Sequence, residues 1–134
     1  MAFVRITIPG KPVGKGRPRF GNGFTYTPKK TVDYENLVQF AWMQTGAEKL
    51  TGAITASIIA HFPIPKSTSK KKRAEIDGKS YTGKPDCDNI AKIILDALNG
   101  IAFDDDSQVS FLHVRKLYDT DEAKVVVELM EVEQ

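Results

Sequence analysis

The sequence predicts an α+β fold, a single domain in which one mixed β-sheet has helices packed on it. Segments with the two-residue period of strands alternate along the chain with segments that have the 3.6-residue period of helices. A length of 134 residues suits one domain, 1–134, and a hydrophobic content of 41% suits an ordinary core. The expected order of elements is β-α-β-α-α-β-β.

The chain begins with a strand and a basic segment. Residues 3–8 (FVRITI) are rich in strand-forming residue types, and Pro9 and Gly10 end that pattern. Residues 10–30 (GKPVGKGRPRFGNGFTYTPKK) contain six Lys and Arg, three aromatic residues and no acidic residue. Their many Gly and Pro residues predict a loop or a pair of short strands.

A helix and a second strand follow the basic segment. We expect the helix to begin at Thr31 or Asp33 and to end near Leu50, with Trp42 in its buried stripe. In residues 53–62 (AITASIIAHF), every second residue from Ile54 to Phe62 is apolar, which predicts a strand with one face in the core.

Residues 63–84 form the main irregular segment. Ser67 or Ser69 can cap a short helix over the residues KKKRAEI, and Asp77 with Gly78 marks the end of that helix. A connection of this length is often functional or mobile.

Another helix and two strands complete the chain. The run that starts at Asp88, DNIAKIILDALNG, has apolar residues at helical spacing and a glycine stop signal. Residues 109–118 and 124–132 have the strand period, and the polar residues 119–123 between them predict a turn. We therefore expect the last two strands to pair as a β-hairpin.

Oxygen ligands and a lysine are concentrated around this helix. Asp86, Asp88 and Asn89 lie at its start, Lys92 lies one turn later, and the triplet 104–106 (DDD) follows its end. Asp and Asn supply the hard oxygen ligands that Mg²⁺ and Mn²⁺ prefer, and a lysine beside them suits chemistry on a phosphodiester. The triplet has to fold back beside the helix start to complete one site. Alternatively, the first aspartates are helix caps and the triplet is a solvated turn.

The run KPDCDNIAKIILDALNGIAFDDDSQV, residues 84–109, resembles the core signature of the RusA family of Holliday junction resolvases. That signature is D-x-D-N-x-x-K, then D-A-L, a short apolar link and D-D-x-Q-V. Several elements in a fixed order are far more specific than one short motif. The N-terminal half resembles the family more loosely, through a short strand, a basic segment and a helix.

The resemblance implies a homodimeric endonuclease that uses Mg²⁺ or Mn²⁺ to cut branched DNA at four-way junctions. It implies that three aspartates bind the metal, here Asp86, Asp88 and Asp106, and that Lys92 is the catalytic lysine. Asp105 is the alternative to Asp106, because this chain has three consecutive aspartates where the family needs only a pair. A two-fold symmetric dimer can place one site on each of two opposing strands of a junction.

Two further residues are expected to support this site. Asn89 would tie down the loop, and Asp96 would orient Lys92 or form only a surface pair with it. In the expected mechanism a divalent ion activates water for in-line attack on the phosphorus. Lys92 would stabilise charge on the phosphate oxygens or the leaving group.

Charge is unevenly distributed along the chain. Residues 1–92 carry 16 Lys and Arg against 7 Asp and Glu, whereas residues 93–134 carry 3 against 10. A basic surface can hold the phosphate backbone of DNA. The alternative is a solvated basic loop and a solvated helix face. The residues predicted to contact DNA are Lys11, Lys15, Arg17, Arg19, Lys70, Lys71, Lys72 and Arg73.

The single cysteine and the hydropathy pattern indicate in which cellular compartment the protein is expected. Cys87 excludes an internal disulfide and cannot build a zinc site alone, and we expect it to be a small residue facing the core. No apolar run approaches the roughly 18 residues of a membrane span, so no membrane partner is expected. A reducing cytoplasm is consistent with both observations.

The residues leave other functions open. The nearest is a nuclease for flaps or plain duplexes, and a different class is a non-catalytic DNA-binding protein. Clustered acids argue against pure binding, because they repel phosphate. Gly10, Gly14 and Lys15 suggest a P-loop, but the spacing is short by one and Gly16 replaces Ser or Thr. Residues 104–110 lack the Gly and the distal Glu of a calcium-binding EF-hand loop.

Overall fold

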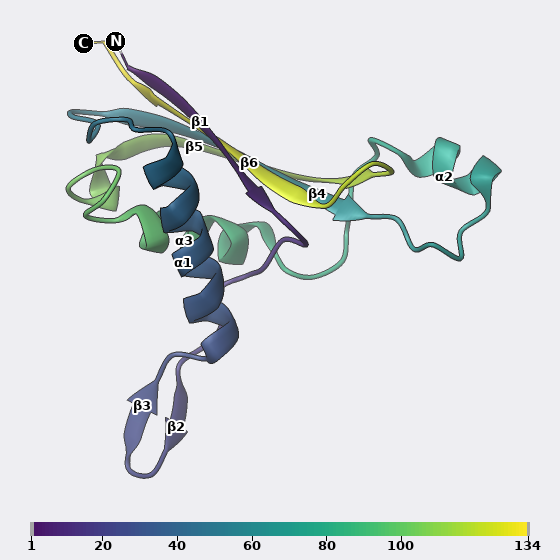
Figure 1. Cartoon of the computed structure of the whole chain (residues 1–134), viewed down its shortest axis with the longest axis horizontal. Coiled ribbons are helices and arrows are strands. Elements are labelled where there is room, and N and C mark those ends of the chain that lie inside the picture. Colours follow the sequence, from purple (N-terminus) through teal and green to yellow (C-terminus); the bar gives the residue numbers. More distant parts are fainter. Residues whose placement is uncertain (1, 134) are drawn as a thin grey trace.

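A four-stranded mixed sheet lies at the centre of the structure, a computed structural model that describes residues 2–133 (Figure 1). Its strands are β1 (Phe3–Pro9), β4 (Ile54–Pro63), β5 (Val109–Asp119) and β6 (Lys124–Glu131), in the order β1-β6-β4-β5. β4 pairs in parallel with β5 and antiparallel with β6, and β1 pairs antiparallel with β6. The predicted α+β fold with a mixed sheet is confirmed.

The predicted hairpin between the last two strands is wrong, because β4 lies between β5 and β6. Alternate residues of β4, from Ile54 to Phe62, are completely buried, so this strand takes a central position in the sheet. The first half of β5 is exposed, which suits an edge. The turn after β5 therefore passes over the end of β4. In the sequence, two alternating strands and a polar turn look the same whether the strands are neighbours or not.

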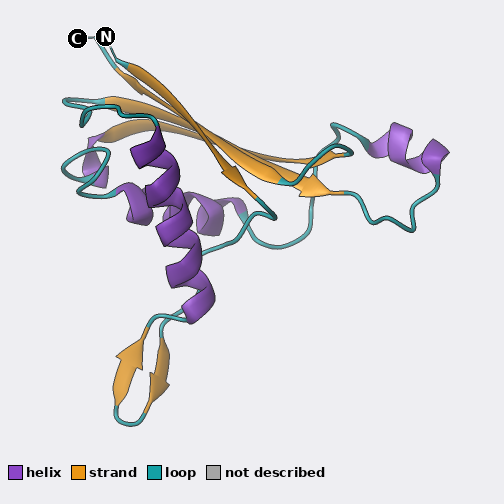
Figure 2. Ribbon diagram, in the orientation of Figure 1, coloured by secondary structure: helices purple, strands orange, loops and turns teal. Residues whose placement is uncertain are grey.

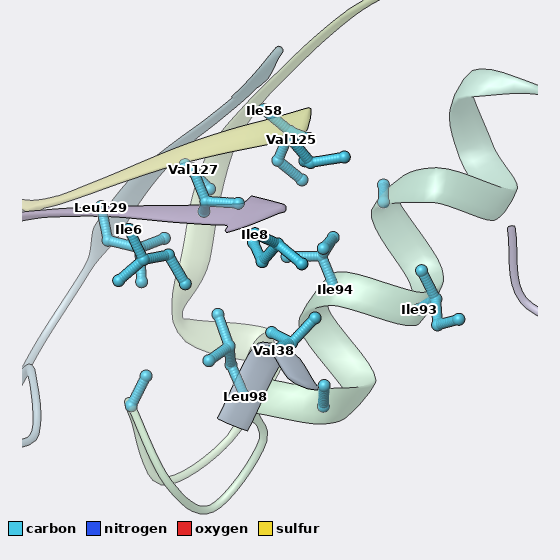
Figure 3. Packing of buried hydrophobic residues seen from close by; sticks show 14 of the residues in the cluster. Ile6, Ile8, Val38, Ile58, Ile93, Ile94, Leu98, Val125, Val127 and Leu129 are labelled. Carbon is cyan, nitrogen blue, oxygen red and sulfur yellow. The ribbon is translucent and has the colours of Figure 1, made fainter. Parts of the chain in front are cut away.

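Two helices cover one face of the sheet (Figures 1 and 2). They are α1 (Lys29–Gln44) and α3 (Cys87–Leu98), which also contact each other. Figure 3 shows Ile8 of β1, Val127 of β6 and Ile94 of α3 meeting in the core between these layers. All three are completely buried. Burial of this kind contributes roughly 1.5–3 kcal/mol per large aliphatic side chain and fixes the rotation of α3 about its axis.

The first long helix ends earlier than predicted, at Gln44 rather than near Leu50. Gly46 follows in the left-handed conformation, with φ of 67°, which ends a helix. The Thr45 hydroxyl donates to the Trp42 carbonyl and accepts from the Ala47 backbone N–H, which reinforces the stop. The prediction that Trp42 belongs to the core is confirmed.

Two short elements project from the body of the molecule (Figure 1). The basic segment forms a two-stranded hairpin, β2 (Arg19–Gly21) and β3 (Phe24–Tyr26). The helix α2 (Lys70–Ile76) has no buried residue, and Ser69 rather than Ser67 caps it by accepting from the Lys72 N–H at 3.2 Å. Among residues 2–133, no helix has the length and apolar character that a membrane span requires.

Cys87 is exposed, which contradicts the expectation that it faces the core. It is the first residue of α3, and the core side of that helix is taken by Ile90, Ala91 and Ile94. The apolar stripe therefore turns Cys87 toward solvent.

Candidate functional site

The start of α3 presents its polar residues to solvent. Asp86 is the last residue before the helix and has an extended backbone, with φ of −70° and ψ of 156°. Its side chain does not cap the helix and instead pairs with Lys84, whose Nζ lies 3.0 and 3.3 Å from the two carboxylate oxygens. Asp88 and Lys92 are exposed on the helix, because the opposite side is buried. The expected row of Asp88, Lys92 and Asp96 is therefore accessible along one side of a rigid element.

The loop that leads into α3 is held from outside by Lys116 of β5. Lys116 Nζ donates to the Gly83 carbonyl at 2.7 Å and to the Pro85 carbonyl at 2.9 Å, and it lies 5.6 Å from the ring centroid of Tyr81. Tyr81 in turn stacks on Phe62 with ring centroids 3.8 Å apart. These contacts fix the path of the chain through Asp86 into the helix.

Sequence reasoning missed Lys116. The sequence held a signal, because the two-residue period puts Lys116 on the same strand face as Val114 and Tyr118; in the structure its strand partner, Ala60, is completely buried. A lysine at a core-facing position of a strand indicates a structural task for its ammonium group.

Lys15 joins the basic segment to both helices. Its Nζ lies 2.7 Å from Glu35 Oε2 of α1 and 3.1 Å from Asp96 Oδ2 of α3. Its backbone N–H donates to the Asn89 carbonyl at 3.0 Å. Burial lowers the pKa of Lys15, but its hydrogen bonds to Glu35 and Asp96 outweigh this and leave the pKa above its ordinary value. Lys15 is thus bonded within the protein, an arrangement that favours a supporting role over DNA contact.

Lys92 reaches the same network through Asp96. Lys92 Nζ lies 3.9 Å from Asp96 Oδ2, the oxygen that Lys15 approaches more closely. The side chain of Lys92 is 61% exposed. The predicted pair of Asp96 and Lys92 therefore exists as a loose contact, and Lys92 remains accessible.

Among residues 2–133, one carboxylate of the aspartate triplet has no partner. Asp104 pairs with Lys49 at 3.0 Å. Asp105 caps the short 3₁₀ helix η1 (Asp106–Gln108) in a reciprocal arrangement with Gln108. Within residues 2–133, the carboxylate of Asp106 forms no hydrogen bond or ion pair. This favours Asp106 over Asp105 as the residue available for a ligand.

The triplet lies at the far end of α3. The Asp106 backbone N–H donates to Asn99 Oδ1 at 2.8 Å, and Asn99 is the C-terminal cap of the helix whose N-terminal cap position is Asp86. A 12-residue helix is about 18 Å long. The chain does not fold back to the helix start, and residues 2–133 contain no group of three metal-binding side chains. A single chain brings Asp86 and Asp88 together but leaves Asp106 apart.

The basic residues fall into two groups. Lys70, Lys71 and Lys72 are exposed on α2, whereas Arg73 donates to the carbonyls of Ile64, Pro65 and Thr120 and so anchors the projection. Three other predicted DNA contacts line a pocket beside the start of α1, together with two lysines that sequence reasoning did not select. The five pocket cations are Lys11, Arg17, Arg19, Lys30 and Lys84.

Comparison with known proteins places this chain in a family. A protein with the name YqaN from Bacillus subtilis (strain 168), described as uncharacterized, is 37% identical over 141 aligned residues, which cover 98% of this chain and 99% of the relative. The family model described as endodeoxyribonuclease RusA matches residues 9–130, a range that includes the basic segment, both long helices and the aspartate triplet. The match covers β4, β5 and all but the last residue of β6, but only Pro9 of β1, and the chain belongs to the RusA family of endodeoxyribonucleases.

Proposed function

We propose that this protein resolves four-way DNA junctions by paired, symmetric phosphodiester cuts, and that it acts in DNA recombination and repair. The observation that carries the proposal is the exposed D-x-D-N-x-x-K motif at the start of a buried, rigid helix in a chain of the RusA family. The elements around the motif hold it without using Asp88 or Lys92. Residues spared from structural contacts are available for chemistry.

The proposed cofactor is Mg²⁺ or Mn²⁺. Asp86 and Asp88 supply two carboxylates of the kind that these ions bind, and Asp86 becomes free once Lys84 moves to solvent. A bound ion would supply Lewis acidity toward a phosphate oxygen. Lys92 would place its ammonium group beside the same phosphate, where it stabilises developing negative charge.

The third carboxylate points to a homodimer. Because Asp106 lies at the far end of α3 from Asp86, one chain does not fit a three-aspartate site. We infer that Asp106 of the partner subunit completes it. Two such sites, related by two-fold symmetry, would cut two opposing strands of a junction.

The edge of β5 offers a surface for this dimer. Residues 78–81 already bond to the outer edge of the second half of β5, for example through the Tyr81 N–H to the Lys116 carbonyl at 3.1 Å. The first half, residues 109–115, pairs only with β4 among the described elements, and Phe111 there is 60% exposed. An exposed apolar edge favours pairing with another strand. An antiparallel contact between two copies of this edge would direct η1 of each copy toward the 78–86 loop of the other.

The decisive experiment is a cleavage assay on a synthetic four-way junction, with a linear duplex and a flap of the same arms as controls. Mg²⁺, Mn²⁺ and EDTA form the three arms of the assay. We expect paired, symmetric nicks in the junction only, and only with metal. Equal cutting of the flap or the duplex would assign the protein to a less selective nuclease.

A non-catalytic DNA-binding protein is the second candidate, and the separation of Asp106 from Asp88 in one chain favours it. It predicts junction binding that is the same in EDTA and in Mg²⁺, with no product in either metal. That result would remove the catalytic proposal and leave the basic surface as the functional feature.

A further inference from the structure

A basic pocket lies beside the candidate site and is formed by segments far apart in the sequence. It has a volume of about 600 Å³ and lies between the basic segment, the start of α1 and the Lys84–Pro85 turn. Its five cations are Lys11, Arg17, Arg19, Lys30 and Lys84, and no acidic residue of the described range 2–133 lines it. A volume of this size lies in the range of sites that hold small ligands or parts of larger ones.

Two glycines allow the walls of the pocket to meet. A Cβ atom on Gly14 would lie 2.6 Å from Pro85 Cβ, and a Cβ atom on Gly16 would lie 2.6 Å from Thr31 Oγ1. The Gly16 N–H donates to the same Thr31 oxygen at 3.1 Å, and Thr31 is 2% exposed. The basic segment can therefore pass close to both the site loop and α1, which a bulkier residue at either position would prevent.

The pocket joins the candidate site through Lys84. Lys84 lines the pocket and at the same time pairs with Asp86. An anionic ligand in the pocket would therefore lie next to the position on the DNA at which Asp86 and Asp88 would act.

The unpaired cations of the pocket indicate which kind of ligand it binds. Lys15, the neighbouring cation, is neutralised by Glu35 and Asp96, whereas Lys11, Arg17 and Lys30 form no ion pair within residues 2–133. Unpaired cations gathered around a concave surface attract a polyanion, and release of its counterions makes binding depend on salt. Proline rings also line the wall and offer apolar surface to the sugar that joins two phosphates.

We propose that this pocket holds a stretch of DNA phosphate backbone next to the candidate site. The proposal rests on the proposed function for the identity of the occupant as DNA. It assigns a phosphate-binding role to Lys30 and Lys84 in addition to Lys11, Arg17 and Arg19.

Lys29 and Lys30 form a matched pair for the test. They are neighbours in the first turn of α1, but only Lys30 lines the pocket, while Lys29 pairs with Asp33 at 2.7 Å. We would measure the affinity of the full-length Lys30→Gln and Lys29→Gln variants for a four-way junction in EDTA at several salt concentrations. For Lys30→Gln we expect the slope of log affinity against log salt to fall in magnitude by about 0.9, the value for one lost phosphate contact. For Lys29→Gln we expect no change.

Equal effects of the two substitutions would overturn the proposal, because binding would then depend only on overall charge. Binding in EDTA does not need cutting, so a failure of the catalytic proposal leaves this comparison valid. A second arm follows the backbone amide signals of Gly14 and Gly16 by NMR during titration with junction DNA and with a nucleoside monophosphate. Equal responses at equal phosphate concentration would identify a small-molecule site and overturn the assignment to DNA.

Discussion

The two ends of α3 both carry carboxylates, but the protein uses them differently. At the start, the backbone is held by Lys116 from β5, and the side chain of Asp88 is left exposed. At the end, the polar groups bond mainly to one another, with Asp105 and Gln108 capping η1. Only Asp106 keeps a carboxylate without a partner there, among the residues described.

The two ends of α3 give a way to separate available carboxylates from structural ones in a short acidic cluster. A carboxylate that caps a turn gives up its oxygens to backbone N–H groups and cannot also bind a metal well. A carboxylate held in place only through its own backbone keeps its oxygens available. The first description fits Asp105 and the second fits Asp88 and Asp106.

Removing an available carboxylate should reduce cleavage most strongly. Asp88→Asn and Asp106→Asn should each reduce junction cleavage by on the order of 10²–10³-fold, the usual effect of losing one charge-stabilising group. Asp105→Asn should leave cleavage within a few-fold of the parent chain and leave stability nearly unchanged, because Asn caps a helix about as well as Asp. Single-turnover cleavage rates and chemical denaturation measure the two effects. A large loss of cleavage in Asp105→Asn with a normal Asp106→Asn would exchange their roles.

Mixing two inactive variants tests whether one site uses both ends of the helix from different chains. If Asp88 and Asp106 act together across a dimer, a heterodimer of Asp88→Asn and Asp106→Asn has one fully intact site and one doubly altered site. Random mixing should restore nicking at about a quarter of the normal number of sites, because half of the dimers are mixed. Denaturation and refolding of the mixture, followed by the junction assay, would measure this. No recovery, despite heterodimers seen by mass spectrometry, would show that each chain builds its own site.

The exposed residues at the start of α3 could be predicted from the sequence, whereas the position of the aspartate triplet at its end could not. The apolar stripe set the helix and the exposed row of Asp88 and Lys92, because a 3.6-residue period determines which side is buried. The position of Asp106 depends on a bond to Asn99 and on the path of the chain after the helix, and periodicity carries no information about either. The predicted hairpin of β5 and β6 was wrong for the same reason, because the packing of β4 between them does not follow from the periodicity of either strand.

The role of Lys15 could not be predicted from the sequence either. Its place in a run of Lys and Arg predicted DNA contact, but its partners, Glu35 and Asp96, lie 20 and 81 residues further along the chain. Composition identifies a basic segment and does not identify which of its charges is already neutralised. Lys11, Arg17 and Arg19 of the same segment line the open pocket instead.

A smaller effect is expected from loosening the start of α3. Lys116→Met keeps most of the apolar stem and removes the bonds to the Gly83 and Pro85 carbonyls. Charge-assisted bonds of this kind contribute about 1.5–3 kcal/mol, and we expect a loss of stability near the lower value because the group is only half-buried. Urea denaturation gives the stability. Arg115→Met, a neighbouring exposed cation of the same strand, is the control and should change stability by less than about 0.5 kcal/mol.

The contact between Lys15 and Asp96 should affect the cleavage rate only weakly, through Lys92. Without the ammonium group of Lys15, Asp96 should draw Lys92 closer than 3.9 Å and make it less available to phosphate. Lys15→Gln should therefore lower the cleavage rate about 3- to 10-fold, equivalent to roughly 1 kcal/mol, and the added substitution Asp96→Asn should restore much of it. Single-turnover rates of the two single variants and the double variant measure this coupling. If the double variant were as slow as Lys15→Gln, Lys15 would act by holding the segment and not by competing for Asp96.

The raised pKa of Lys15 gives the same network a second, independent readout. A group whose pKa is higher in the folded state stabilises the fold fully below its unfolded value, near 10.4, and loses that contribution as pH rises through the folded value. The thermal midpoint of the parent chain should therefore fall more steeply above about pH 10 than that of Lys15→Gln. Lys29→Gln is a useful contrast, because its partner Asp33 is exposed and the pair should contribute little to stability. Parallel curves for the parent and Lys15→Gln in that range would mean that the bonds to Glu35 and Asp96 are as weak as those of an ordinary surface pair.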